Sequence, residues 1–267
     1  MTGDSNVVWI VDAHVHLHQS FDMAAFLDSA RQNLANLAHR EGLSRDSGWH
    51  AALLFTESFG DDGFGTLLRT RKVGPWSIRS AQEGWLQAQH DDGATPLHIA
   101  AGRQIVTRER LEVAALATTR VVKDGQAMEQ VIDELLADDV LPALPWGFGK
   151  WTGHRGTVIE RMLARYSPGQ LLLGDNGGRA ALSVRPPLFA KAESQGRIVI
   201  AGTDPLPFAS ECSRVGSYAS LVKAGETPQT LMESLRTLRK SPPVLGSRAG
   251  LPYFVRSQVR MQLRKRQ

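Results

Sequence analysis

Hydrophobic positions along the chain fall into two kinds of segment. Short apolar runs such as residues 7–11 (VVWIV) and 198–201 (IVIA) predict strands buried on both faces, because they are mostly β-branched or aromatic. Residues 21–40 and 126–139 instead place apolar side chains three and four positions apart, which predicts amphipathic helices. Strands alternating with helices are typical of a parallel sheet in an α/β protein.

The middle of the chain extends this pattern with one interruption. Further strands are expected at residues 49–58, at LEVAALAT and at QLLLG, and helices at 156–167 and 186–195. From Trp76 onward, polar and apolar residues alternate singly, with a turn signal at DDG. We therefore expect an inserted β-hairpin or meander around residues 76–110, beside the main sheet.

The first strand ends in Asp-x-His-x-His, at residues 12–16. Residues two apart on a strand point the same way, so His14 and His16 are expected to project together from its C-terminal end. Two neutral imidazoles that converge suit a divalent cation. A chance pair of histidines is the alternative, but the preceding strand and the late segment Gly-Thr-Asp-Pro, which places Asp204 at another strand end, favour a metal site.

These two segments resemble the amidohydrolase superfamily, in the branch whose last strand ends in a Gly-Ser/Thr-Asp-x-Pro-like sequence; TatD-type nucleases are a more distant match. The resemblance implies a (β/α)8 barrel with His14 and His16 as metal ligands and Asp204 as ligand and proton acceptor. Family members usually add histidines from central strands, and binuclear members often add a carboxylated lysine. None of the six other histidines ends an obvious central strand. One divalent ion is therefore expected, zinc first, with manganese or iron as alternatives.

A loop at residues 145–156, PWGFGKWTGHRG, is the next candidate for the site. Its glycines let backbone approach a ligand closely, and Trp146 and Trp151 are suited to wall a pocket. Lys150 and Arg155 suggest that a carboxylate or phosphate binds nearby. The alternative is a surface loop whose aromatic side chains cover the end of the barrel.

Two other strand ends carry polar groups where a barrel places its active site. Glu57 follows the second strand, and Asp175, Asn176 and Arg179 follow LLLG. We expect Glu57, Asp175 and Arg179 to bind substrate, with an ordinary surface role open for Glu57.

Composition favours one globular unit of 267 residues and 29.2 kDa, which suits a single barrel domain over residues 1–255. Residues 256–267 form a tail with five basic residues and no acid, which we interpret as a solvated helix. Docking of this tail to an acidic partner, a lipid surface or nucleic acid is the alternative. No segment reads as a membrane span or secretory signal, and the single cysteine, Cys212, fits a reducing cytoplasm.

The function expected from these features is metal-dependent hydrolysis of a small anionic molecule, an amide, ester or lactone, with decarboxylation as a second reaction. A barrel that has lost its metal and acts as a binding or assembly protein is the main alternative, and a TatD-type nuclease ranks third. Nucleic acid is not expected as a partner, because no basic motif interleaved with aromatic residues is present. A homo-oligomer is open.

Overall fold

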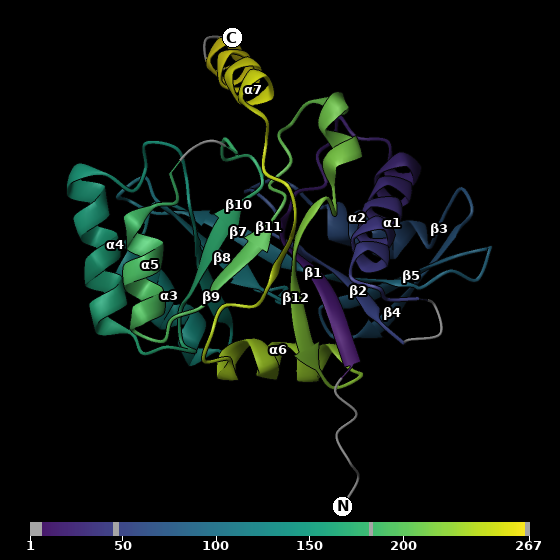
Figure 1. Ribbon diagram of the computed structural model, residues 1–267, viewed down its shortest axis with the longest axis horizontal. Helices are drawn as coiled ribbons and strands as arrows, with labels where there is room; N and C mark the ends of the chain where they lie inside the picture. The colour runs from purple at the N-terminus through teal and green to yellow at the C-terminus, as the bar shows by residue number, and fades with distance from the viewer. Residues whose placement is uncertain (1–6, 45–47, 182–183, 265–267) are drawn as a thin grey trace, which may run out of the picture.

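Two mixed β-sheets form the centre of the computed structural model, which describes residues 7–44, 48–181 and 184–264 (Figure 1). The larger sheet has eight strands in the order β13-β12-β1-β2-β6-β5-β4-β3, and the smaller has five in the order β11-β10-β9-β8-β7. The strand bounds are β1 Val7–Val15, β2 His50–Phe55, β3 Lys72–Val73, β4 Trp76–Gln82, β5 Trp85–His90, β6 Leu97–Ala100, β7 Gly102–Val106, β8 Glu112–Leu116, β9 Leu141–Pro145, β10 Leu172–Asn176, β11 Val199–Gly202, β12 Tyr218–Ala224 and β13 Val244–Gly246.

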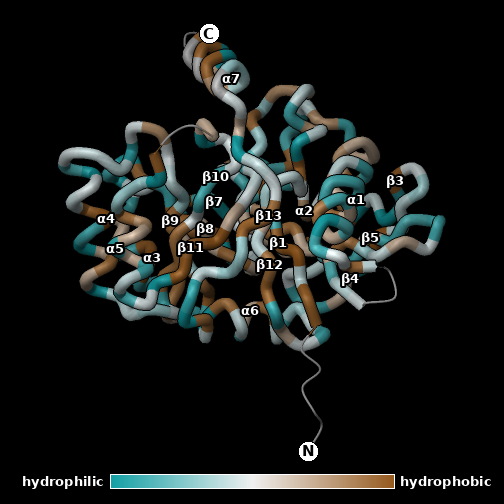
Figure 2. The backbone as a smooth tube through the Cα atoms, in the orientation of Figure 1, coloured by the Kyte–Doolittle hydropathy of each residue, from teal (hydrophilic) through white to brown (hydrophobic). Residues whose placement is uncertain are grey.

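Helices cover the outer faces of both sheets. The bounds are α1 Met23–Arg40, α2 Gly63–Thr70, α3 Met128–Ala137, α4 Gly153–Arg165, α5 Pro187–Ser194, the 3-10 helix η2 Ala209–Arg214, α6 Pro228–Thr237 and α7 Leu251–Arg264. One apolar cluster joins α1 and α2 to the larger sheet, and a second joins α3, α4 and α5 to the smaller sheet. A third, rich in alanine, fills the space between the sheets, where α6 closes one end. Apolar residues accordingly follow the interior strands (Figure 2).

The two sheets meet along two seams. Along one, the Asp204 amide donates to the His14 carbonyl at 2.8 Å, which joins the end of β11 to β1. Along the other, the Glu57 amide donates to the Gly102 carbonyl at 3.1 Å, which joins the end of β2 to β7. Glycine is required at both seams: a Cβ on Gly202 would lie 2.4 Å from the His14 nitrogen, and one on Gly102 would lie 2.1 Å from the Phe55 carbonyl oxygen.

The expectation of a (β/α)8 barrel is wrong. Such a barrel needs parallel strands joined by helices, whereas β12 runs antiparallel to β1, and β7, β8 and β9 pair antiparallel in sequence. The physical reason is connection length. A single residue, Ala101, separates β6 from β7, and five residues separate β7 from β8, so neither connection has room for a crossover helix.

The expected insertion at residues 76–110 is also corrected. β4 and β5 do form an antiparallel hairpin, but it extends the larger sheet through β6 and is not set beside it. β6 and β7, in the same region, are strands of the two sheets themselves. Single-residue alternation identified strands here without showing which of them are central.

The C-terminal helix α7 projects from the body above the C-terminal ends of the central strands (Figure 1). It begins at Leu251, before the expected start of a separate tail at residue 256, and residues 265–267 of that tail lie outside the described part. Among the described helices, none is both long and apolar enough to cross a membrane.

A cluster of aromatic and imidazole rings lies on the inner face of the larger sheet, at the end away from α7. Trp9 stacks on His50 with ring centroids 4.5 Å apart, and His98 approaches Trp9 at 5.0 Å. His98 is only 7 % exposed, and neither of its ring nitrogens has a hydrogen-bond partner among the described residues. Burial, with the nearby His50, lowers the pKa of His98 to about 4.

We expect this buried histidine to make the fold sensitive to acid. In the unfolded chain His98 binds a proton below about pH 6.5, whereas in the folded chain it does so only below about pH 4. The free energy of unfolding therefore falls as the pH drops from 6.5 to 4. The contribution is about 2 kcal/mol between pH 7.5 and pH 5. His98→Leu should flatten the pH dependence of the free energy of unfolding, measured with urea, by that amount. The exposed His39 supplies a control: His39→Gln should leave the curve unchanged, and an equal effect of both substitutions would contradict the assignment.

Candidate metal centre

The first strand aims two imidazoles at one point. The register of β1 against β2 shifts between Asp12 and Val15, and such an irregularity redirects the side chains that follow it. His14 and His16 are both about 5 % exposed, and their Nε2 atoms lie 3.0 Å apart. The predicted convergence of these two residues is therefore present.

Asp204 supplies a third donor from the far end of the chain. Its Oδ1 lies 3.6 Å from the Nε2 of His14 and 3.6 Å from that of His16. The two Nε2 atoms and Oδ1 form a triangle, and a point inside it lies about 2.0 Å from all three atoms. Zinc binds imidazole nitrogen and carboxylate oxygen at about this distance. Among the described residues, this is the group of histidine, cysteine and acidic side chains that can hold a metal ion.

The charge states of these groups suit a cation. Burial lowers the pKa of His16 to about 3, and the neighbouring His14 adds to the effect, so His16 is neutral near pH 7 and its lone pair is available. Burial alone would raise the pKa of Asp204, but electrostatic interactions with its neighbours His14, His16 and Lys150 outweigh burial and lower the pKa, so Asp204 is ionised. Two imidazole nitrogens and one carboxylate oxygen fit a divalent ion with a position left for water.

Asn176, at the end of β10, holds the Asp204 carboxylate in place. Its Nδ2 donates to Asp204 Oδ2 at 2.6 Å, which leaves Oδ1 facing the two histidines. The backbone of Asp204 has a φ of 49°, a left-handed conformation that aspartate tolerates better than most residues. The amide and the turn together direct one carboxylate oxygen toward the imidazoles.

Asp12 joins the two halves of the site from beneath. It is fully buried; its Oδ1 accepts hydrogen bonds from the amides of Thr203 at 2.7 Å and His14 at 3.4 Å. Its Oδ2 accepts from the Gly216 amide at 2.9 Å and from the Thr203 hydroxyl. Burial raises the pKa of Asp12 to about 6, against the opposing effect of these donors. The carboxylate therefore ties β1 to the residues just before Asp204.

A cleft of about 420 Å³ opens onto the centre. His16 and Asp204 line it, with three of the residues expected to bind substrate, Trp146, Lys150 and Arg179. Lys150 forms an ion pair with Glu112, also in the cleft. Helix α7 supplies a wall that the sequence did not associate with the site, made of Tyr253, Phe254, Ser257 and Met261.

The other four expected substrate residues lie elsewhere. Glu57 is buried and accepts from the Phe64 amide at 2.8 Å, so it caps α2. Trp151 packs edge-on against Phe189 in the outer core, 5.4 Å between ring centroids. Arg155 donates to the carbonyl of Gly149 at 2.7 Å. None of these three lines the cleft, and a loop prediction cannot tell which side of a loop faces the site.

Asp175 is buried next to the cleft but is occupied by other groups. It accepts two hydrogen bonds from Arg179, at 2.9 and 2.7 Å, and one from the Tyr218 hydroxyl at 3.0 Å. The pair Asp175 and Arg179 therefore acts as one neutral unit, with Arg179 bordering the cleft.

The sequence places Asn176 at a strand end of the expected site but does not predict the contacts that hold the centre together. The positioning contact of Asn176 and the donors from Thr203 and Gly216 depend on strands distant in sequence. The α7 wall had one signal, the aromatic pair Tyr253 and Phe254 directly before the basic tail.

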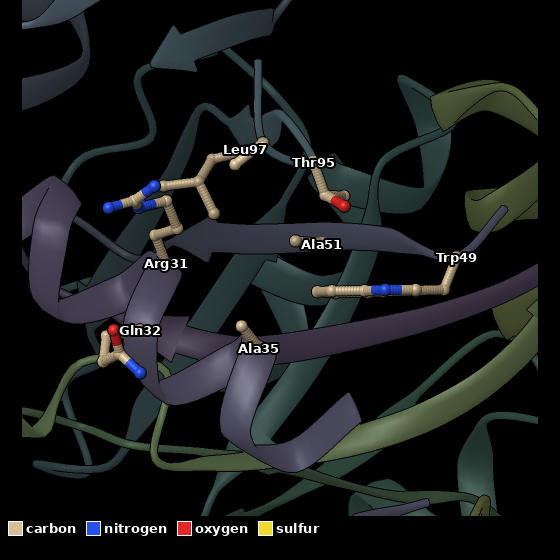
Figure 3. Close-up of a pocket in the computed structure, with 8 residues that line it drawn as sticks. Arg31, Gln32, Ala35, Trp49, Ala51, Thr95 and Leu97 are labelled. Atoms are coloured by element: carbon tan, nitrogen blue, oxygen red, sulfur yellow. The ribbon is translucent and has the colours of Figure 1, made fainter. Parts of the chain in front are cut away.

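A separate hollow of about 200 Å³ lies between α1 and the strands β2 and β6. Arg31 and the Trp49 ring border its opposite ends, with Ala51 between them (Figure 3). It contains none of the predicted site residues.

Comparison with known proteins shows the fold. No protein-family model and no curated protein matches the chain. Among solved structures, PsfC from Pseudomonas syringae PB-5123 is similar at a TM-score of 0.57 and 14 % identity, over 96 % of this chain and 98 % of that one. The lesion-specific endonuclease PfuEndoQ from Pyrococcus furiosus is similar at a TM-score of 0.52 and 10 % identity, over 86 % of this chain and 56 % of that one.

A third structure, Endonuclease Q in complex with a 27-mer duplex substrate that has an abasic lesion at the active site, is similar at a TM-score of 0.50 and 8 % identity, over 86 % of this chain and 57 % of that one. An enzyme that acts on duplex DNA thus shares this fold. The expectation that nucleic acid is not a partner relied on the absence of a linear motif, and the similarity to an enzyme with a duplex substrate contradicts it. This chain spans little more than half the length of the two endonuclease chains.

We expect removal of the Asn176 amide to weaken metal binding. Without its hydrogen bond, the Asp204 carboxylate rotates away from the histidines, and loss of such an outer contact costs about 10- to 100-fold in affinity. The comparison is Asn176→Ala with Asn36→Ala, at an exposed position on α1, titrated calorimetrically with Zn²⁺ and Mn²⁺. Equal affinities for both variants would show that Asp204 does not need this support.

We expect Asp12→Asn to destabilise the whole fold. Both carboxylate oxygens accept from backbone amides, those of Thr203 and Gly216. In asparagine one of these oxygens is replaced by an NH₂ group, so one buried amide loses its acceptor. The loss should be about 3 kcal/mol in the free energy of unfolding. Thr203→Val, which removes only the hydroxyl contact, should lose about 1 kcal/mol. Denaturant unfolding of the two variants measures both, and a loss for Asp12→Asn no larger than for Thr203→Val would refute the central role of this carboxylate.

Proposed function

We propose that the protein is a metal-dependent hydrolase whose metal ion is held by His14, His16 and Asp204. The observation that carries the proposal is the convergence of three donor atoms around a point about 2.0 Å from each. Three protein ligands with an open position are the arrangement of catalytic metal sites. A divalent ion held there would supply Lewis acidity and would lower the pKa of a bound water, so that hydroxide is available near neutral pH.

The side chains around that position have distinct roles. Asn176 fixes Asp204 Oδ2, so the carboxylate offers Oδ1 to the metal position that it shares with the two histidines. Lys150 and Arg179 line the cleft as cations, each paired with an acid, and orient an anionic substrate by hydrogen bonds rather than by excess charge. Trp146 and Phe148 form apolar walls for a planar group.

Within hydrolysis, we favour a phosphate ester as the substrate class. A cleft of about 420 Å³ suits a group of nucleotide size and is too small for a duplex. A nucleotide within nucleic acid would have to leave the base stack to enter it. The similar endonuclease, whose substrate is duplex DNA with an abasic lesion, supports this class over the amides, esters and lactones implied by the amidohydrolase resemblance. The amide, ester or lactone hydrolysis implied by that resemblance stays a prediction.

One observation favours a second candidate, a metal-free binding protein. The Nδ1 atom of His16 is buried without a hydrogen-bond partner, whereas histidines that ligate metals usually donate this N–H to a carboxylate or carbonyl. Metal content decides between the two.

We expect the purified protein to contain about one equivalent of zinc, manganese or iron. The His14→Ala, His16→Ala double variant should lose it, as measured by plasma mass spectrometry on protein purified without an immobilised metal. The exposed pair His39 and His154 gives a matched control, since replacing both with alanine removes the same number of imidazoles outside the site. Negligible metal in all three proteins after reconstitution would leave the binding protein as the better account.

We expect the metal-loaded protein to hydrolyse bis(p-nitrophenyl) phosphate faster than a p-nitroanilide or a lactone. Asp204→Asn removes the charged ligand but keeps the shape, and should reduce kcat about 100-fold or more. Initial rates for the three substrates, with each metal, test this. Preferential turnover of the amide or lactone would retain a hydrolase but reject the phosphate-ester class.

A further inference from the structure

A second hollow, of about 580 Å³, lies beside the metal cleft and is basic. It lies against β11, β12 and β13 and the segment that joins α6 to β13. Five basic and two acidic side chains line it: Arg179, Arg185, Arg239, Lys240 and Arg248, with Asp175 and Glu193. We call it the basic hollow.

Both acids of the basic hollow are already paired. Asp175 accepts from Arg179, and Glu193 accepts from the Arg185 guanidinium at 2.5 and 2.8 Å. The charges of Arg239 and Lys240 are therefore not balanced by an acid among the described residues that line the hollow. Arg239 and Lys240 are exposed, near the start of the segment that joins α6 to β13.

Arg179 joins the basic hollow to the metal cleft, because its side chain lines both. It is only 2 % exposed and is held by two hydrogen bonds from its guanidinium to Asp175. A ligand in the metal cleft and a ligand in the basic hollow would therefore border the same fixed guanidinium.

We infer that the basic hollow binds the phosphodiester backbone of a nucleic-acid strand whose reacting ester lies in the metal cleft. A single phosphate would be served by the cleft alone, whereas two adjoining anion sites suit a polymer with a charge on every unit. Arginine forks match phosphate oxygens in two-point contacts.

Aromatic side chains in the metal cleft separate nucleic acid from an acidic peptide. Trp146, Phe148, Tyr253 and Phe254 line the cleft, and Phe148 is 66 % exposed. Exposed aromatic rings beside a basic groove are the means by which proteins stack unpaired bases. An acidic peptide would use the charges and leave these rings without a partner.

The position of the reacting ester in the metal cleft rests on the proposed function, but binding of a strand in the basic hollow does not. Strand binding is therefore tested separately. Arg239→Ala, Lys240→Ala should weaken binding of a fluorescein-labelled single-stranded DNA of about 20 nucleotides roughly tenfold near 0.1 M salt. The slope of log affinity against log salt should also fall by about 1.4, the value for two lost phosphate contacts on a single strand. Fluorescence anisotropy measures both.

The matched control is Lys123→Ala, Arg161→Ala. Both positions are exposed, both lie outside the basic hollow and the metal cleft, and the pair removes the same charge. This control should bind DNA like the unsubstituted protein, and thermal melting should show both double variants folded. Equal binding by the two double variants would refute the basic hollow as a strand site, as would binding of poly-glutamate as tight as that of DNA.

The double variant of His14 and His16 separates the two proposals. We expect it to lose phosphodiester hydrolysis and to keep strand binding, because neither histidine lines the basic hollow. Hydrolysis that survives in this variant would refute the proposed function and leave the strand site standing. Failure of the Arg239 and Lys240 effect, with hydrolysis lost as expected, would refute the strand site alone.

Discussion

The metal centre and the seam beside it depend on the buried carboxylate of Asp12. It accepts hydrogen bonds from His14 on its own strand, from Thr203 at the end of β11, and from Gly216 just before β12. The contact with Thr203 lies at the seam where β11 of the smaller sheet meets β1 of the larger sheet. A charge buried so deeply is tolerated only because hydrogen-bond donors surround it. The carboxylate therefore depends on the backbone donors at the seam, and the seam depends on the carboxylate as their acceptor.

The metal centre follows from this seam. Asp12 lies two residues before His14, and Thr203 lies directly before Asp204, so the same contacts that join β1 to β11 bring the imidazoles and the carboxylate together. Gly202 allows the two strands to approach closely enough, since a side chain there would collide with His14. The geometry of the site is therefore held by backbone, and Asn176 adjusts only the orientation of one carboxylate.

Charge around the centre is arranged in pairs. Lys150 with Glu112 and Arg179 with Asp175 present cations to the cleft without leaving it strongly positive. Basic side chains outnumber acidic ones in the basic hollow beyond Arg179. The fold by itself does not determine the reaction, because function depends on the residues of the site rather than on the architecture. The proposal of hydrolysis depends on the three donor atoms, and that of a phosphodiester on the surfaces next to them.

The sequence alone determined what is local. Strand periodicity placed His14 and His16 on one side of a buried strand, and Gly-Thr-Asp-Pro placed Asp204 at a strand end, because side-chain direction in a strand follows from backbone geometry. Tertiary structure decided the pairing direction of the strands, which excludes the predicted barrel. It also decided that the side chains of Glu57, Trp151 and Arg155 make contacts outside the cleft. It also decided that Asp175 would pair with Arg179 and that α7 would wall the cleft. These outcomes depend on contacts between residues far apart in the chain, which hydrophobic periodicity does not encode.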